Sequence, residues 1–269
     1  MKFLTGYTLV EFPALGIDFD VYENFLEIPI GDDTLTIKFY GVIIAFGFLL
    51  AALFGGRKAY TWKMSLDSMV DVLIYGIIGA VVGARLYYVI FQWDYYKNDL
   101  LSVFKIWEGG LAIYGGVIGA ALCGFVMAKV RKVKFTDILD LAALGFLIGQ
   151  GIGRWGNFVN QEAFGALTGS SWWGMQSENT IYDVGEGMVH PCFLYESVWC
   201  ILGFFVLLFI LKKCRKFSGQ LFLTYGIWYG LERMIVEGMR TDSLYIGNTS
   251  LRVSIKSSAL SSGRPAIRS

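Results

Sequence analysis

The sequence FTDILDLAALGFLIGQGIGRWGNFVNQEAFG, residues 135–165, decides the fold class. It begins as a long apolar run that ends near residue 153. It continues with one Arg, two Asn, one Gln and one Glu within nine residues. Polar groups at this density beside a bilayer are costly unless they face a protein interior or a ligand. We therefore expect a membrane helix that leads directly into a functional site.

The composition supports a membrane protein and excludes several function classes. The chain has 269 residues, of which 55% are hydrophobic and only 17% are charged. The net charge is +1, and no basic stripe is interleaved with aromatic residues, so we expect no nucleic-acid partner. The four cysteines lack a CxxC spacing and the chain has one histidine. We therefore expect no metal and no cofactor.

The apolar runs predict an all-α fold, a polytopic integral membrane helical bundle with an external loop region. Lys and Arg gather in the first, third and fifth loops between the predicted helices. The positive-inside rule then places these loops in the cytoplasm and the polar segment 154–165 at the outer face. Six membrane helices are expected, at about residues 38–56, 69–92, 110–128, 135–153, 191–211 and 220–238.

The same pattern predicts three parts of the chain. Residues 1–37 form an outward-facing N-terminal segment. Residues 38–242 form the membrane helical domain, which includes an external loop at 154–190, and this loop is too long for a simple turn. Residues 243–269 form a polar C-terminal tail that is too polar to cross a bilayer.

Glycines recur at helical spacing in two predicted helices. Gly145, Gly149 and Gly153 lie four residues apart, as do Gly79 and Gly83. This spacing is typical of close helix packing through small residues. Further glycines, at 109, 110, 115 and 116, flank Tyr114. They favour either packing and hinge motion or a close approach of the backbone to a ligand, and both interpretations stay open.

The last predicted helix carries a polar face. Tyr229, Arg233, Glu237 and Arg240 fall within an arc of about 80° on a helix. One interpretation is that Arg233 and Glu237 neutralise each other and fix helix packing. The other follows from the excess of Arg over Glu, which favours an anion site of the kind that binds a phospholipid phosphate.

Three other residues have two interpretations each. Arg85, near the outer end of the second predicted helix, either extends to the membrane interface or contributes to the site. His190 precedes Pro191 and either caps the fifth helix or belongs to the site. Cys192 suits a small buried thiol better than a nucleophile, because the sequence offers no neighbouring base.

Together these segments resemble the prolipoprotein diacylglyceryl transferase family, from about residue 20 to Ser254. The family signature Gly-Arg-x-Gly-Asn-Phe-x-Asn-x-Glu-x-x-Gly matches at Gly153, Arg154, Gly156, Asn157, Phe158, Asn160, Glu162 and Gly165. Similar pieces follow the family order at Tyr40-Gly41, Gly83-Ala84-Arg85, residues 115–119, residues 190–196, and Tyr229, Arg233, Glu237 and Arg240.

The chain departs from the family pattern in two places. Many members have His-Gly-Gly where this chain has Tyr114-Gly115-Gly116. A tyrosine hydroxyl is a poorer proton acceptor than an imidazole at neutral pH. Members also continue into a seventh membrane helix after the position of Ser254, where this chain has its polar tail.

The resemblance implies a transferase of the bacterial plasma membrane, with several membrane passes and an active site near the outer face. Its reaction moves a diacylglyceryl group from phosphatidylglycerol to the lipobox cysteine of a prolipoprotein. A thioether forms and glycerol 1-phosphate leaves. The implied partners are phosphatidylglycerol, prolipoprotein signal peptides with a lipobox cysteine, and membrane lipids, with no cofactor. We expect a monomer.

The resemblance also implies residue roles. Arg154 and Arg233 stabilise the leaving phosphate, and Tyr114 or His190 assists proton removal. Glu162 and Glu237 orient the arginines. The residues expected to bind phosphatidylglycerol are Arg154, Asn157, Asn160, Glu162, Tyr40, Arg85, Tyr229, Glu237 and Arg240. The residues expected to have structural roles are Gly153, Gly156, Gly165, Gly115, Gly116 and Glu196.

A rival interpretation from another class is a small membrane transporter or lipid-binding protein. Its inward Arg and Glu side chains would bind an anionic solute or headgroup without covalent chemistry. Such a protein often contains an inverted repeat, and the two halves of this sequence show no convincing repeat. The amide-rich external segment also suits a protein acceptor better.

Overall fold

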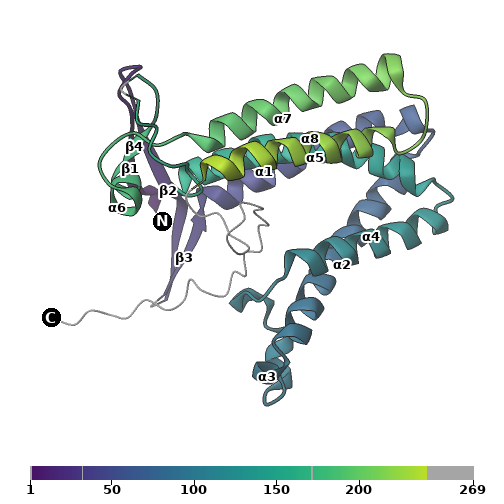
Figure 1. The fold of residues 1–269 in the computed structure, drawn as a ribbon. Helices are drawn as coiled ribbons and strands as arrows, with labels where there is room; N and C mark the ends of the chain where they lie inside the picture. Colours follow the sequence, from purple (N-terminus) through teal and green to yellow (C-terminus); the bar gives the residue numbers. More distant parts are fainter. Residues whose placement is uncertain (1, 32, 171, 241–269) are drawn as a thin grey trace. The chain divides into compact units, whose positions relative to one another are not determined.

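The computed structural model describes residues 2–31, 33–170 and 172–240 (Figure 1). The described residues form two units, and each is treated by itself. The first contains the residues up to Arg57 and from Leu139 onward, and the second contains Lys58–Ile138. The polar tail expected at residues 243–269 lies outside the described residues.

The chain is a helical, multi-pass membrane protein. Its long helices are α1 (Phe39–Lys58), α2 (Leu66–Phe91), α4 (Ile113–Val130), α5 (Phe135–Val159), α7 (Cys192–Phe209) and α8 (Gln220–Met239). Five segments in the described part of the chain, built on α1, α2, α4, α5 and α7, are long and apolar enough to cross a membrane. The sixth predicted helix, α8, also forms, but it carries Glu232, Arg233 and Glu237 and falls outside that set.

The predicted end of the helix at residue 153 is wrong. Helix α5 continues to Val159, so the first half of the polar segment is helical. Two aromatic side chains explain the extension. Phe158 is buried, and Trp155 donates from its indole Nε1 to Ser197 Oγ at 3.2 Å. The loop that follows α5 therefore begins after Val159 rather than at Arg154.

Helices of the first unit are held together by small residues and by tryptophans. A Cβ on Gly47 of α1 would lie 3.2 Å from Ile152 of α5, so α1 and α5 pack closely. Between α7 and α8, Trp199 and Trp228 each donate to the backbone carbonyl of the other, at 3.1 and 3.0 Å, and their rings stack at 4.7 Å. These reciprocal bonds fix the register of α7 against α8.

A buried carboxylate joins the start of α5 to the start of α8. Asp140 is fully buried and accepts from Arg215 Nη2 and the Gly219 amide, both at 3.0 Å, and from the Phe222 amide at 3.1 Å. Two of these donors are backbone amides at the beginning of α8, where a helix has unpaired N–H groups and favours negative charge. Asp140 was not among the residues for which the sequence predicted a structural or functional role.

In the second unit, α2 and α4 pack through glycines, as the spacing predicted. A Cβ on Gly79 would lie 2.6 Å from Cys123 Sγ, and one on Gly83 would lie 2.9 Å from Gly119 Cα. Both would require the backbones to separate. Arg131 after α4 forms an ion pair with Asp71 of α2. The short helix α3 (Trp93–Tyr96) follows α2.

The N-terminal segment forms a sheet, which the sequence interpretation did not anticipate. The strands are β1 (Lys2–Phe12), β2 (Ile17–Ile30), β3 (Asp33–Lys38) and β4 (Gln176–Ser177), antiparallel in the order β3-β2-β1-β4. The missed signal is the alternation in IDFDV at the start of β2, because apolar and acidic residues alternate there with the period of a strand. Helix α6 (Glu178–Val184) follows β4.

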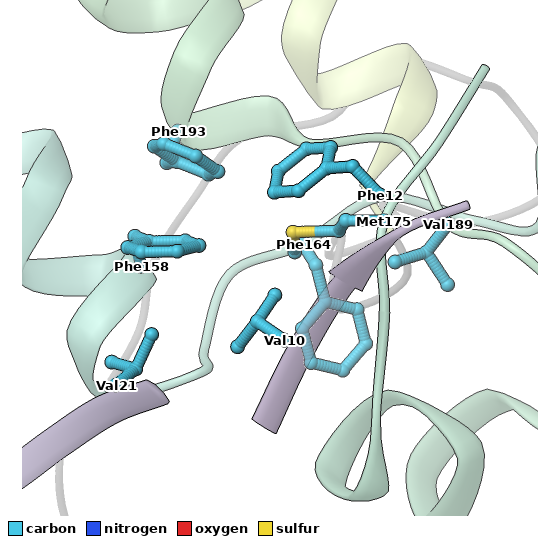
Figure 2. Packing of buried hydrophobic residues seen from close by; sticks show 8 residues of the cluster. All are labelled: Val10, Phe12, Val21, Phe158, Phe164, Met175, Val189 and Phe193. Carbon is cyan, nitrogen blue, oxygen red and sulfur yellow. The ribbon is translucent and has the colours of Figure 1, made fainter. Parts of the chain in front are cut away.

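One apolar cluster joins this sheet to the polar segment (Figure 2). Its buried members are Val10, Phe12, Val21, Phe158, Phe164, Met175, Val189 and Phe193. The rings of Phe158 and Phe193 lie 4.6 Å apart, between α5 and the first turn of α7. The cluster therefore fixes the backbone on both sides of residues 159–163.

Candidate functional site

Two arginines from different helices meet at one buried carboxylate. Glu196 of α7 is 1% exposed, and its Oε1 lies 3.0 Å from Nη2 of Arg154 on α5. The same oxygen lies 3.8 Å from Nη1 of Arg233 on α8. The predicted structural role of Glu196 thus has a geometric basis, since one acid brings together the two arginines singled out by the sequence.

The polar face of α8 is present over one turn. Arg233 Nη2 donates to Glu237 Oε2 at 2.6 Å, which realises the expected orientation of Arg233 by Glu237. Arg240, however, does not extend that helical face. Helix α8 ends at Met239, and Arg240 is extended and forms an antiparallel bridge with Gly165. The geometric prediction for Arg240 is wrong because the chain leaves the helix to pair with the polar segment.

These ion pairs leave capacity to bind an anion. A guanidinium has five N–H donors, and the described pairs use only some of them on Arg154 and Arg233. Both side chains keep some exposure, 18% and 23%. An arginine held by a buried acid is pre-oriented, so it binds a phosphate with little loss of side-chain freedom.

Within the described residues Glu162, in the turn after α5, does not contact an arginine as predicted. Its carboxylate accepts from Asn157 Nδ2 at 3.0 Å, whereas the acid paired with Arg154 is Glu196. The reason is local, because the chain turns back at Gln161 and Ala163, whose φ angles are 49° and 58°. Non-glycine residues rarely adopt this left-handed conformation, and such strain often occurs at functional sites.

Asn160 and Tyr40 flank this turn. The Oδ1 atom of Asn160 is buried, and within residues 2–31, 33–170 and 172–240 it has no hydrogen-bond partner. The ring of Tyr40 lies against Gly156, where a Cβ would come within 2.6 Å of ring Cδ2. Gly153 similarly faces Ile44, at 3.2 Å from a Cβ. Gly153 and Gly156 therefore allow α1 to approach α5 beside Arg154.

Gly165 lies where three segments meet. Its amide donates to the His190 carbonyl at 2.9 Å, and the next amide, that of Ala166, donates to the Met239 carbonyl at 2.7 Å. A Cβ on Gly165 would lie 2.7 Å from His190 Cβ and 3.0 Å from Cys192 Sγ. Only glycine fits here, so the residue joins the polar segment to the start of α7 and the end of α8.

His190 does not cap α7, because that helix has no side-chain cap. Its Nδ1 lies 3.3 Å from the hydroxyl of Tyr195, which also accepts from Trp173 Nε1 at 2.6 Å.

Cys192 is completely buried, which fits the structural interpretation of that thiol. On α8, the ring of Tyr229 stacks on that of Tyr225 at 6.0 Å.

The remaining predicted residues belong to the second unit. Arg85 is 6% exposed and donates to five carbonyls, those of Ser102, Val103, Lys105, Gly109 and Gly110. It holds the loop before α4, and its role in lipid binding stays a prediction. Tyr114, in the first turn of α4, is 53% exposed. Gly115 is buried, and a Cβ there would clash with the Gly83 carbonyl oxygen and with Tyr87 Cβ, which favours the packing interpretation for this residue. Gly116 is partly buried, and a Cβ there would lie at an ordinary contact distance of 3.5 Å from the Ala80 carbonyl.

Sequence reasoning missed several residues at the site. Glu232 of α8 is 2% exposed, with its Oε1 4.0 Å from Cys200 Sγ. A charge inside a membrane helix is a signal of function, so Glu232 could have been found from the sequence. Trp173 and Ser197 had no such signal, because their roles depend on partners distant in sequence.

In the part of the chain that the structure describes, no group of His, Cys, Asp or Glu could hold a metal ion.

Comparison with known proteins identifies the family. Residues 28–262 match the family model of prolipoprotein diacylglyceryl transferase. A phosphatidylglycerol–prolipoprotein diacylglyceryl transferase of Listeria welshimeri is 46% identical over 219 residues, which cover 80% of this chain and 79% of that protein. Proteins of the same name from Finegoldia magna and Halalkalibacterium halodurans are 44% and 42% identical. The alignments cover 82% and 80% of this chain, and 85% and 75% of those proteins. The chain belongs to the prolipoprotein diacylglyceryl transferase family.

Proposed function

We propose that this chain transfers the diacylglyceryl group of phosphatidylglycerol to the lipobox cysteine of a prolipoprotein. The observation that carries the proposal is the convergence of Arg154 and Arg233 on Glu196, within a signature segment of this family. Membership of a transferase family does not favour the transporter interpretation, in which no covalent bond would form.

The reaction needs help at the thiol and at the phosphate. The cysteine sulfur attacks the glycerol carbon, a C–S bond forms, and the C–O bond to the phosphate breaks with its electron pair leaving on glycerol 1-phosphate. The attacking species is the thiolate, so a proton must leave the thiol. Negative charge grows on the departing phosphate, and Arg154 and Arg233 are fixed in place to stabilise it.

The neighbouring polar groups serve the substrate's headgroup in this proposal. Asn160 has a buried acceptor oxygen that suits a glycerol hydroxyl. Tyr40, Tyr229 and the Asn157–Glu162 pair complete the polar lining, and Glu237 holds Arg233. Tyr114 and His190 are the candidates for assisting proton removal. Arg85 and Arg240 contribute positive charge for the anionic lipid.

We further propose that the enzyme acts in the bacterial plasma membrane as a monomer. Its site lies near the outer face, where a signal peptide with a lipobox cysteine presents its thiol. The positive loops of the sequence support this orientation. Phosphatidylglycerol reaches the site laterally from the surrounding membrane lipids.

A mass assay in membranes tests the function. A lipobox peptide incubated with phosphatidylglycerol and the enzyme should gain the mass of a diacylglyceryl group on its cysteine. Arg154→Ala and Arg233→Ala should abolish the gain, whereas Arg57→Ala, at an exposed arginine of α1, should keep it. Transport or tight binding of the lipid without a mass gain would instead support the rival interpretation.

A further inference from the structure

Three side chains of the first unit form a connected chain of hydrogen-bonding groups. Trp173 Nε1 lies 2.6 Å from Tyr195 Oη, and the same oxygen lies 3.3 Å from His190 Nδ1. All three side chains are partly buried. Trp173 comes from the loop before α7, whereas Tyr195 belongs to the first turns of α7. These hydrogen bonds therefore link the loop to a membrane helix.

The direction of the hydrogen bonds follows from the donor and acceptor chemistry. An indole N–H only donates, so the Tyr195 oxygen accepts from Trp173. The hydroxyl hydrogen of Tyr195 then needs an acceptor, and His190 Nδ1 is the acceptor within reach in the described structure. If Nδ1 donated instead, that hydrogen would have no described acceptor. A hydroxyl that already accepts a hydrogen bond is also a stronger donor.

This direction fixes the tautomer of His190. A neutral imidazole that accepts at Nδ1 carries its proton on Nε2. The other ring nitrogen of His190 is therefore a hydrogen-bond donor. The residue lies beside Gly165, whose amide donates to the His190 carbonyl at 2.9 Å. The side chain of His190 also starts at this junction, because a Cβ on Gly165 would lie 2.7 Å from His190 Cβ.

We propose that His190 Nε2–H donates a hydrogen bond to a phosphate oxygen of the substrate, and that Tyr195 and Trp173 are positioning residues that fix this donor. The proposal rests on the proposed function and narrows it, because it leaves proton removal from the thiol to another group. As the C–O bond breaks, the phosphate gains negative charge, so a donor held in place strengthens its interaction in the transition state.

The tautomer can be measured directly, because the chain contains a single histidine. The full-length protein, purified with a histidine-free tag and carrying isotopically labelled histidine, gives one pair of imidazole nitrogen signals by NMR. At a pH where the ring is neutral, we expect an unprotonated Nδ1 and a protonated Nε2. Tyr195→Phe should shift the signal of Nδ1, because that nitrogen loses its hydrogen bond. A proton on Nδ1 in the unaltered protein would overturn the proposal.

Kinetics with matched variants test the donor itself. Glutamine places its amide N–H near the position of Nε2, whereas asparagine places it near Nδ1. His190→Gln should keep kcat/KM within roughly 10-fold, and His190→Asn and His190→Ala should lose roughly 10- to 100-fold. Equal losses for Gln and Ala would overturn the donor role.

The positioning residues have their own control. Trp173→Phe and Tyr195→Phe should lower kcat by roughly 10-fold with little change in KM, because the donor loses its orientation. Trp172→Phe, at the neighbouring and 74% exposed indole, should not change kcat. Failure of the proposed function would give a different result. The unaltered protein would then form no thioether, although its histidine would still show the expected tautomer.

Discussion

Glu196 Oε1 lies 3.0 Å from Arg154 Nη2 although the two residues are distant in sequence and belong to different helices. The carboxylate is 1% exposed and Arg154 is 18% exposed, so the acid is the buried member of the pair. Removing one member of a buried ion pair leaves the other charge uncompensated, which costs more than the pair itself contributes.

Glu196→Gln should therefore destabilise the protein and impair catalysis together. We expect the free energy of unfolding to fall by about 3–5 kcal/mol and the transferase activity to fall at least tenfold, because Arg154 loses its anchor. Thermal unfolding in detergent and the peptide mass assay measure the two effects. Glu186→Gln, at an exposed loop carboxylate, is the control. Full activity in the Glu196 variant would contradict the role of this acid.

Gly165→Ala should disrupt the junction between the polar segment and α7. The added methyl would lie 2.7 Å from His190 Cβ, so the backbone of residues 165–166 must shift. We expect activity to be nearly abolished while the helical circular dichroism signal is retained. Gly230→Ala serves as the control, because a Cβ there has no neighbour within 4 Å and alanine favours a helix. Equal activity of the two variants would show that the close contact is unimportant.

Asp140→Asn should affect stability and not the chemistry. The variant keeps the shape of the side chain but removes the charge that Arg215 and the α8 amides share. We expect a loss of about 3 kcal/mol in unfolding free energy, with kcat unchanged per folded molecule. A double variant with Arg215→Met should recover part of the loss. Additive losses would mean that the two side chains do not stabilise each other.

Arg85→Lys should loosen the loop before α4 even though the positive charge remains. A lysine ammonium has three donors on one nitrogen, so it cannot reach all five carbonyls that the guanidinium contacts. Hydrogen exchange over residues 97–111 should become faster, while exchange in α8 stays the same. Arg57→Lys, at an exposed position, is the matched control. Unchanged protection of the loop would rule out this holding role.

Sequence reasoning found five of the long helices, α1, α2, α4, α5 and α7, because each carries an apolar run of membrane length, a signal contained within one segment. It found Arg154, Arg233 and Glu237 because charges in such runs are rare and because the signature segment is specific. It did not foresee that Glu196 rather than Glu162 pairs with Arg154. That pairing depends on the backbone turn at Gln161 and Ala163. Neither glutamine nor alanine predicts a left-handed conformation.

The pairing of β4 with β1 escaped prediction for a related reason. Strands gain their stability from partners, and β1 is paired with β2 along its length but with β4 over only two residue pairs. The bridge between Gly165 and Arg240 is likewise a contact between segments far apart in the chain. Such long-range pairings cannot be deduced from the local pattern of either segment.

The apolar cluster of Figure 2 has a consequence for exchanging parts between relatives. Val10, Phe12 and Val21 precede residue 28, where the match to the family begins, yet they pack with Phe158 and Phe164 of the signature segment. Residues within the match thus pack on residues that precede it. A chimera that joins this N-terminal sheet to the membrane helices of a relative needs matching apolar residues on both sides of that boundary.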